Sequence, residues 1–366
     1  MGLGISIYPL QSSYEENSAY IKSAAALGYT RVFTSFLEAD TDPAVAATQL
    51  ESYRVLLQEA QQLGMRAFLD INPEIVKLLK IDPTDFQFFA NLGVKGVRLD
   101  GAFNGFYEAY LTYNEYDIAI EINGSFDSGY VNSIVELGGN KQNLLTCHNF
   151  YPEADTGLSI SCFESCHARH KSLGLHTAAF VTSQEGGRLG PWDANDGLCT
   201  LERHRYLPIE QQAQELYQAG IDDVIIGDAF ASERELAALA QLQPTITTLT
   251  VETTDDTIDL FAHVFQNRWD YSDVVIRDVM SRKLFKQLTI TPQTIEERQI
   301  AAGTILVNND TYGRYKGEIL IALQPMVIDS RRNIIGTVTE QSKSLLAAIT
   351  GGKRFKCAIK TKIEVK

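Results

Sequence analysis

The sequence lacks several features by which a chain of its size is often classified. No apolar run is long enough to span a bilayer, and the first residues, MGLGISIYPL, carry no basic segment that would indicate a secretory signal. Positive charge is scarce, with 32 Lys and Arg against 46 Asp and Glu and a formal net charge of −14 in 366 residues. A chain this acidic repels nucleic acid and anionic membranes, so we expect neither as a partner.

Cysteine is also scarce, and its spacing does not indicate a metal site. The five cysteines are an odd number, which favours free thiols in a reducing cytoplasm. The stretch SISCFESCHARH brings Cys162, Cys166, His167 and His170 together, but on a predicted helix and without the second ligand pair of a zinc site. We therefore expect a cytoplasmic protein with no metal and no cofactor.

Internal repeats are absent, and no Gly-rich nucleotide-binding motif follows the first predicted strand, which disfavours an open doubly wound sheet. Short apolar runs alternate instead with amphipathic stretches of helix length up to about residue 242. The runs are continuously apolar, as in strands buried on both faces. The predicted strands are 3–9, 30–37, 65–73, 96–101, 117–124, 144–152, 175–183 and 223–230; the predicted helices are 15–27, 44–63, 83–91, 105–112, 127–137, 159–173, 208–219 and 232–241.

This strict alternation predicts a (β/α)8 TIM barrel of the α/β class, with an open eight-stranded sheet as the alternative. After Pro244 the pattern becomes β-rich, with one short helical stretch near 255–263, and predicts a small, closed, mostly antiparallel β-barrel. We therefore expect a barrel domain over 1–243 and a second domain over 244–366. The strands predicted in the second domain are 245–253, 273–279, 303–309, 317–323, 333–339 and 355–366.

Polar side chains follow most of the predicted barrel strands, at the rim where TIM-barrel active sites form. The acids Asp70, Asp100, Glu121 and Asp228 would crowd this rim, and like charges held close together raise one pKa. Glycoside cleavage needs this division between a proton donor and an ionised carboxylate. We predict Asp100, Glu121 and Asp228 as the catalytic groups. Arg98 would face the same side as Asp100 and hold it ionised, although an ion pair that only closes the barrel is the alternative.

The motifs at these strand ends resemble the 6-phospho-N-acetylmuramidase (MupG-type) family. Members combine an N-terminal TIM barrel with a C-terminal cyclophilin-like domain, which agrees with the two domains predicted from the pattern. The resemblance covers nearly the whole chain and rests on GISIYP (4–9), DINP (70–73), GVRLDG (96–101), EIN (121–123), HNFYP (148–152), TLERHR (200–205), IGD (226–228) and NNDTYGRYKGEI (308–319).

The resemblance implies a cytoplasmic glycosidase of peptidoglycan recycling. Such an enzyme hydrolyses the bond between 6-phospho-N-acetylmuramic acid and N-acetylglucosamine, in a disaccharide phosphorylated during import by a phosphotransferase system. A looser similarity relates Asp100 and Glu121 to the nucleophile and acid positions of α-amylase-type retaining glycosidases, which is a likeness between folds.

A phosphorylated, carboxylated substrate needs cationic partners in so acidic a chain, and Arg pairs with phosphate through two hydrogen bonds. The candidates are Arg188 and Arg205, in the long loop 184–208 that we expect to form a lid or wall, and Arg268, Arg277 and Arg314 in the second domain. Trp192 and Phe150 are candidates for stacking on sugar rings. The other residues predicted to bind substrate are Tyr8, Asp70, Asn72, Arg98, Asn123, His148, Asn149, Tyr151 and Glu202.

The residues leave the mechanism open between direct attack by Asp100, attack by the substrate's own N-acetyl group, and inversion by an activated water. Two other classes of protein also remain. A sugar-phosphate lyase or aldolase of the Schiff-base type would place a Lys at a strand end, and none of the eight predicted strands ends in one. A non-catalytic sugar-phosphate sensor would not need four rim carboxylates.

Overall fold

The computed structural model describes residues 1–82, 84–101, 104–126, 129–193, 195–253, 255–293 and 298–361. The chain divides into two compact units, Met1–Leu242 and Gln243–Lys366. The end of the last predicted strand, 362–366, lies outside the described residues.

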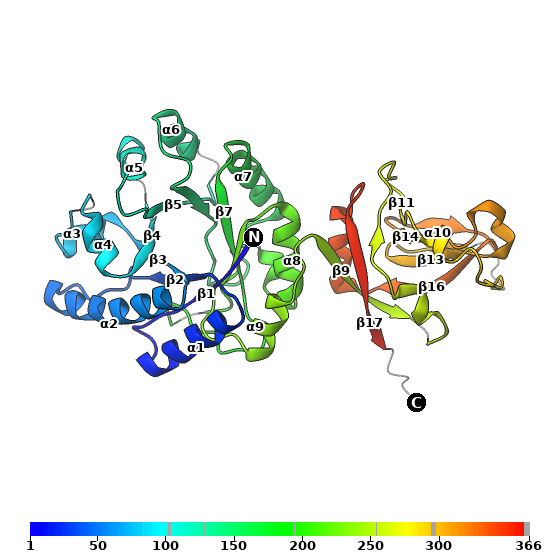
Figure 1. The fold of residues 1–366 in the computed structure, drawn as a ribbon, viewed down its shortest axis with the longest axis horizontal. Coiled ribbons are helices and arrows are strands. Elements are labelled where there is room, and N and C mark those ends of the chain that lie inside the picture. Colours follow the sequence, from blue (N-terminus) through cyan, green and yellow to red (C-terminus); the bar gives the residue numbers. More distant parts are fainter. Residues whose placement is uncertain are drawn as a thin grey trace. The chain divides into compact units, whose positions relative to one another are not determined.

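The first unit is a closed barrel of eight parallel strands, each paired with its neighbours in chain order, with β8 closing onto β1 (Figure 1). This confirms the predicted TIM barrel and rules out the open sheet. Each strand lies within or close to its predicted range. The strands are β1 (Gly2–Ser6), β2 (Arg31–Ser35), β3 (Arg66–Ile71), β4 (Val94–Leu99), β5 (Ala119–Asn123), β6 (Leu144–Cys147), β7 (His176–Val181) and β8 (Asp223–Ile226).

Helices surround this barrel and bury their apolar faces against the strands (Figure 1). Two of them were not predicted, α3 (Pro73–Leu78) and the short 3₁₀ helix η1 (Glu202–His204). The helix α3 follows β3 because Asn72 accepts a hydrogen bond from the backbone of Ile75 and Pro73 suits the first helical position. The helices are α1 (Tyr14–Ala26), α2 (Pro43–Gln62), α3, α4 (Phe86–Asn91), α5 (Phe106–Leu111), α6 (Tyr130–Glu136), α7 (Ile160–Ser172), the 3₁₀ helix η1 (Glu202–His204), α8 (Ile209–Ala219) and α9 (Glu233–Ala240).

Charged side chains lie inside the barrel, toward the end at which its strands begin. Arg31, the first residue of β2, pairs with Glu121 at 2.5 Å and with Asp223, the first residue of β8, at 3.5 Å. The Arg31 guanidinium also lies 3.6 Å from the centroid of the Phe68 ring. A Cβ at Gly96 would come within 2.2 Å of that ring, so glycine in β4 leaves the space that Phe68 fills.

The second unit is built on one mixed sheet of seven strands in the order β10-β17-β9-β16-β13-β14-β11. The sheet is mostly antiparallel, as predicted, with one parallel pairing, between β17 and β9 over eight residues. A bridge between Asn267 and Asp278 links the two edge strands, which makes the sheet nearly closed. The sheet strands are β9 (Ile246–Thr253), β10 (Phe265–Gln266), β11 (Val275–Arg277), β13 (Thr304–Asn308), β14 (Ile319–Ala322), β16 (Arg332–Val338) and β17 (Arg354–Thr361).

Short elements complete this unit. The strands β12 (Arg298–Ile300) and β15 (Met326–Ile328) form a separate antiparallel pair. The helical segments are η2 (Asp255–Phe261), α10 (Ser281–Leu284), η3 (Asp310–Tyr315) and η4 (Glu340–Ala348).

Candidate active site

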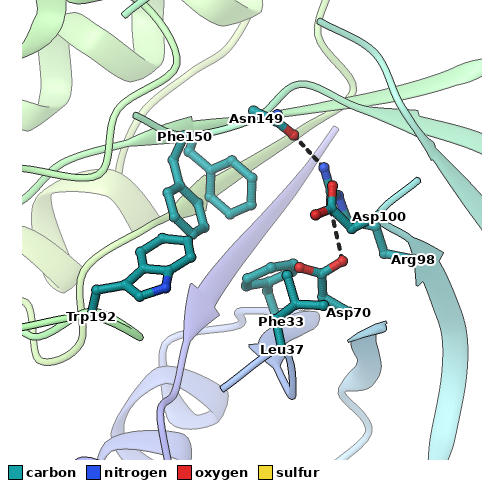
Figure 2. Close-up of a pocket in the computed structure, with 9 residues that line it drawn as sticks. Phe33, Leu37, Asp70, Arg98, Asp100, Asn149, Phe150 and Trp192 are labelled. Atoms are coloured by element: carbon teal, nitrogen blue, oxygen red, sulfur yellow. Dashed lines mark hydrogen bonds and ion pairs between the residues drawn. The ribbon is translucent and has the colours of Figure 1, made fainter. Parts of the chain in front are cut away.

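A pocket opens at the carboxyl ends of the barrel strands, with about 380 Å³ of empty space. Figure 2 shows a charged cluster on one side of the pocket and aromatic rings facing it from the other. The pocket is lined by Phe33, Leu37, Asp70, Arg98, Asp100, Asn149, Phe150, Phe180 and Trp192.

Arg98 of β4 organises the charged side of the pocket. Its Nη1 donates to Asp70 Oδ1 of β3 at 2.7 Å and to Asp100 Oδ1 at 3.3 Å, and its Nη2 donates to the side-chain oxygen of Asn149 (Figure 2). The strands explain why these side chains meet. Arg98 and Asp100 are two residues apart and therefore point to the same side, and Arg98 is in register with Asp70 on the neighbouring strand. The predicted contact between Arg98 and Asp100 is confirmed.

The two carboxylates of this cluster have different surroundings. Asp70 is buried, and burial raises its pKa to about 6 against the lowering effect of Arg98, with the nearby Asp100 adding to the rise. The Asp100 side chain is 38% exposed and reaches the pocket from just beyond the end of β4. The cluster therefore pairs a buried carboxyl group, whose pKa is raised to about 6, with a second carboxyl group that is accessible from the pocket.

Aromatic side chains form the opposite wall. Phe33 and Phe180 face the pocket from β2 and β7, with Phe150 at 6.1 Å and 5.0 Å from them between ring centroids. Trp192 lies 5.8 Å from Phe150. Its indole nitrogen donates to Glu38 Oε1 at 2.5 Å, which joins the long loop after β7 to the loop after β2. The long loop thus contributes Trp192 to this wall of the pocket.

Glu121 does not lie beside Asp100 at the rim, as the sequence had suggested. It is the third residue of the five-residue β5, fully buried inside the barrel and paired with Arg31. It is in register with Arg98, but barrel strands are tilted and staggered, so residues paired along the sheet lie at different heights. Its position therefore argues for a structural role and against contact with a substrate.

Asp228 and Tyr8 are at the rim but do not line the pocket. Asp228 is buried and accepts hydrogen bonds from Thr182 Oγ1 at 2.6 Å and from the Ser183 backbone at 2.9 Å. Burial raises the pKa of Asp228, although the Thr182 hydroxyl opposes the shift. Tyr8 is also buried and donates to the backbone oxygen of Gly227 at 2.7 Å. Through these hydrogen bonds, both side chains hold the loops after β7 and β8.

His148 also lies away from the pocket. Its ring packs against α7, 4.7 Å from Phe163 and 6.1 Å from both His167 and His170 between centroids. It is fully buried, and neither ring nitrogen has a hydrogen-bond partner among the described residues. Burial, with His170 and His167 nearby, holds the pKa of His148 well below its usual value. The predicted substrate contact is thus not supported by its placement.

This burial predicts a pH-dependent stability. An unfolded His has a pKa near 6.5, so the stability that a neutral His148 contributes is complete above that pH and is lost as the pH falls below it. We expect His148→Met to reduce the slope of unfolding free energy against pH by about 1.4 kcal/mol per pH unit between roughly pH 6 and 5. Urea unfolding at several pH values measures this slope, with pH 8 as the control. An unchanged slope would show that His148 is accessible to protons in the folded state.

Five further predicted residues take part in contacts that hold loops. Asn123 accepts a hydrogen bond from the backbone of Ser125 at 2.9 Å, and Asn72 caps α3. Glu202 pairs with Arg205 at 2.6 Å, and the buried Arg205 guanidinium donates to the backbone oxygen of Tyr151 at 3.1 Å. Tyr151 itself is bridged to the loop after β7 through Cys199. These contacts position the rim loops, and none of these side chains lines the pocket.

The remaining arginines fall into two groups. Arg268 and Arg277 already have carboxylate partners, Asp270 at 2.8 Å and Glu318 at 2.9 Å. Arg188 is exposed on the long loop and donates to the backbone oxygen of Asp196 at 3.0 Å. Arg314 is exposed and lines a hollow in the second unit.

Part of the aromatic wall was not predicted from the sequence. Phe33, Leu37 and Phe180 line the pocket without having been named. In a continuously apolar strand, hydrophobicity alone does not show which side chains point into the barrel. For Phe33 a signal was available, because it precedes the polar Ser35 by two positions and so lies on the same face of the strand. No group of His, Cys, Asp and Glu suited to a metal occurs in the described part of the chain. None of the described helices is both long and apolar enough to cross a membrane.

The fold and the pocket define a two-domain TIM-barrel protein with an acidic site at its carboxyl rim. The model of the 6-phospho-N-acetylmuramidase N-terminal domain matches residues 3–241, and that of the C-terminal domain matches residues 245–358. The chain belongs to the 6-phospho-N-acetylmuramidase family.

Two solved structures are similar over nearly their whole length. An uncharacterized B. cereus protein is 38% identical with a TM-score of 0.86, and the match covers 98% of this chain and 99% of that one. A conserved Enterococcus faecalis protein of unknown function is 26% identical with a TM-score of 0.73, covering 98% and 97%. No curated protein matches the chain.

Proposed function

We propose that the protein is a glycoside hydrolase that cleaves 6-phospho-N-acetylmuramyl-N-acetylglucosamine during the recycling of peptidoglycan. The membership of both domains in one family supports the substrate class. The observation that carries the chemistry is the Asp70–Arg98–Asp100 cluster, which faces an aromatic wall in a pocket at the barrel rim. Glycosidases need a proton donor and a carboxylate in this arrangement.

In this proposal Asp70 is the general acid. Its raised pKa, about 6, lets it protonate the oxygen of the leaving N-acetylglucosamine. Asp100 accepts a hydrogen bond from Arg98 and stabilises positive charge at the anomeric carbon, either by attacking it or by orienting the N-acetyl group that does so. Asp70 and Asp100 thus replace the pair that the sequence alone suggested.

The geometry favours retention of configuration at the anomeric carbon. One oxygen of each carboxylate lies within 2.7 Å and 3.3 Å of the same Arg98 nitrogen. These two oxygens are therefore closer together than the roughly 6.5–9.5 Å between carboxyl groups in inverting enzymes. Proton NMR of the first product formed distinguishes the α and β anomers, and we expect the anomer of the substrate.

The activity assay compares the phosphorylated muramyl disaccharide with its unphosphorylated form. Release of N-acetylglucosamine from the phosphorylated form supports the proposal, and incorporation of oxygen from labelled water identifies hydrolysis. Product formed without label would indicate a lyase. Binding of the phosphorylated disaccharide without turnover would indicate a sensor.

The protonation of Asp70 predicts the pH dependence of the reaction. A general acid works only while protonated, so we expect kcat to fall as the pH rises above about 6, where Asp70 loses its proton. The decrease approaches tenfold per pH unit. Initial rates between pH 5 and 8 at saturating substrate measure this limb of the profile. A rate that stays constant through this range would contradict the role of Asp70.

Trp192 is expected to hold a sugar ring against the pocket. Trp192→Ala removes a large aromatic surface, so KM should rise by about tenfold, equivalent to roughly 1.4 kcal/mol, while kcat changes less. The matched control is Trp269→Ala, which removes the other, more exposed tryptophan of the chain. An equal effect of both substitutions, or no effect of the first, would exclude this role.

A further inference from the structure

A cationic hollow lies in the second unit, formed by α10 and Lys286 just beyond it, and by η3 and Lys316. It has about 980 Å³ of empty space and is open to solvent. We call it the basic hollow. Its lining residues are Arg282, Lys283, Lys286, Gly313, Arg314 and Lys316, so five of the six are cations and none is apolar.

These cations are largely without acidic partners. Lys316 pairs with Asp310 at 2.6 Å. Arg282, Lys283, Lys286 and Arg314 have no carboxylate within ion-pair distance among the residues that the structure describes. In a protein of net charge −14, acids are available to neutralise most basic side chains. Like charges held close together are unfavourable, so this concentration indicates an anionic ligand.

The local structure holds two of the guanidinium groups together. Arg282 and Arg314 both lie over the ring of Tyr315, at 5.5 Å and 5.4 Å from its centroid. Gly313 has φ 58° and ψ −123°, which only glycine adopts readily, and this turn lies inside η3 next to Arg314. A shared aromatic ring limits the freedom of both side chains and prepares them for one ligand.

We propose that the basic hollow binds the phosphate monoester of a small phosphorylated molecule. Arg282 and Arg314 would supply paired hydrogen bonds to the phosphate oxygens, and Lys283, Lys286 and Lys316 the remaining positive charge. The concentration of cationic side chains fits a hydrophilic, anionic ligand, and the net charge of −14 opposes a long polyanion. The phosphate belongs either to the muramyl substrate or to a free sugar phosphate, and binding does not depend on hydrolysis in the barrel.

Calorimetric titration of the full chain at low ionic strength tests this site. The probes are inorganic phosphate, N-acetylglucosamine 6-phosphate and unphosphorylated N-acetylglucosamine. We expect the two phosphates to bind and the plain sugar not to. Arg282→Gln with Arg314→Gln should weaken phosphate binding roughly 10–100-fold, as expected for the loss of two charge-assisted hydrogen bonds. Lys283→Gln with Lys286→Gln provides a second test that leaves Tyr315 and its two arginines intact.

The matched control is Arg331→Gln with Lys343→Gln, which removes the same number of positive charges from the same unit. Both side chains pair with acids outside the basic hollow, Asp329 and Glu340. This control should bind phosphate as the wild type does. Thermal unfolding of each variant verifies that it is folded.

Steady-state kinetics then separate the two sources of the phosphate. If the basic hollow holds the substrate, Arg282→Gln with Arg314→Gln raises KM for the phosphorylated disaccharide and leaves kcat unchanged. If it holds a free sugar phosphate, KM is unchanged although phosphate binding is weakened. An oligonucleotide is titrated as a fourth probe. Three results overturn the proposal: no binding of either phosphate by the wild type, phosphate binding by both hollow variants that equals that of the wild type, or binding of the oligonucleotide alone.

Discussion

Asp100→Asn is expected to lower kcat for the phosphorylated disaccharide by about 10³-fold or more, because the neutral amide cannot stabilise the positive charge that develops at the anomeric carbon. Asp70→Asn should cost about 10²–10⁴-fold through loss of the general acid. Both side chains line the pocket, and neither substitution changes the size of the side chain appreciably. Initial rates at saturating substrate measure both effects.

A matched control separates chemistry from a general loss of charge. Asp193 is exposed in the long loop, next to Trp192, and Asp193→Asn should leave kcat within about twofold, as is usual for surface changes away from a site. A substrate with a good leaving group adds a second criterion, since it needs little protonation and should restore much of the rate of Asp70→Asn but not of Asp100→Asn. Normal turnover by Asp100→Asn would remove Asp100 from the mechanism.

The architecture of the barrel was predictable because it depends on local signals. Continuous apolar runs, amphipathic stretches of helix length and the spacing between them predicted all eight barrel strands in order. The pairing of β17 with β9 was not predictable, because parallel pairing between segments about 100 residues apart leaves no local pattern. The helix α3 was missed because Asn72 and Pro73 were assigned to the preceding strand.

The candidate site was only partly predictable, for a geometric reason. Asp70, Arg98, Asp100 and Asn149 were all named from strand ends, and the structure brings them together around one guanidinium. Glu121 was named by the same rule, but β5 continues two residues beyond it. The rule depends on where each strand ends, and an error of two residues moves a side chain down one layer of the barrel.

The basic hollow shows a second limit of prediction from a single sequence. Arg314 was named because it stands beside aromatic residues, whereas Arg282, Lys283 and Lys286 were not. They lie about 30 residues earlier in the chain, and only the fold brings α10 beside η3. A single sequence reveals such a cluster only when its members are neighbours along the chain.

Glu121→Gln is expected to reduce the free energy of unfolding by about 3–5 kcal/mol, because it removes one partner of a buried ion pair and leaves the Arg31 charge undercompensated inside the barrel. The activity per folded molecule should change little, since Glu121 does not line the pocket. Urea unfolding gives the stability, and kcat measured at a temperature where the variant is folded gives the activity.

Two further variants distinguish the buried pair from ionic contacts in general. Arg31→Met combined with Glu121→Met replaces both charges with apolar side chains and should recover most of the lost stability, because neither charge is then buried alone. Asp223 retains His176 and Arg66 as partners in that variant. The surface pair of Arg54 and Glu51 provides the control, and Glu51→Gln should change the stability little, because an ion pair exposed to solvent contributes little.

The opposite outcome is equally informative. If Glu121→Gln folds with normal stability but loses about 10³-fold in kcat, the acid named from the motif is catalytic after all. A substrate would then have to reach below the layer of Asp70 and Arg98, into the charged interior that holds Arg31. The stability and kcat of Glu121→Gln therefore decide whether the buried ion pair takes part in catalysis or only stabilises the core of the barrel.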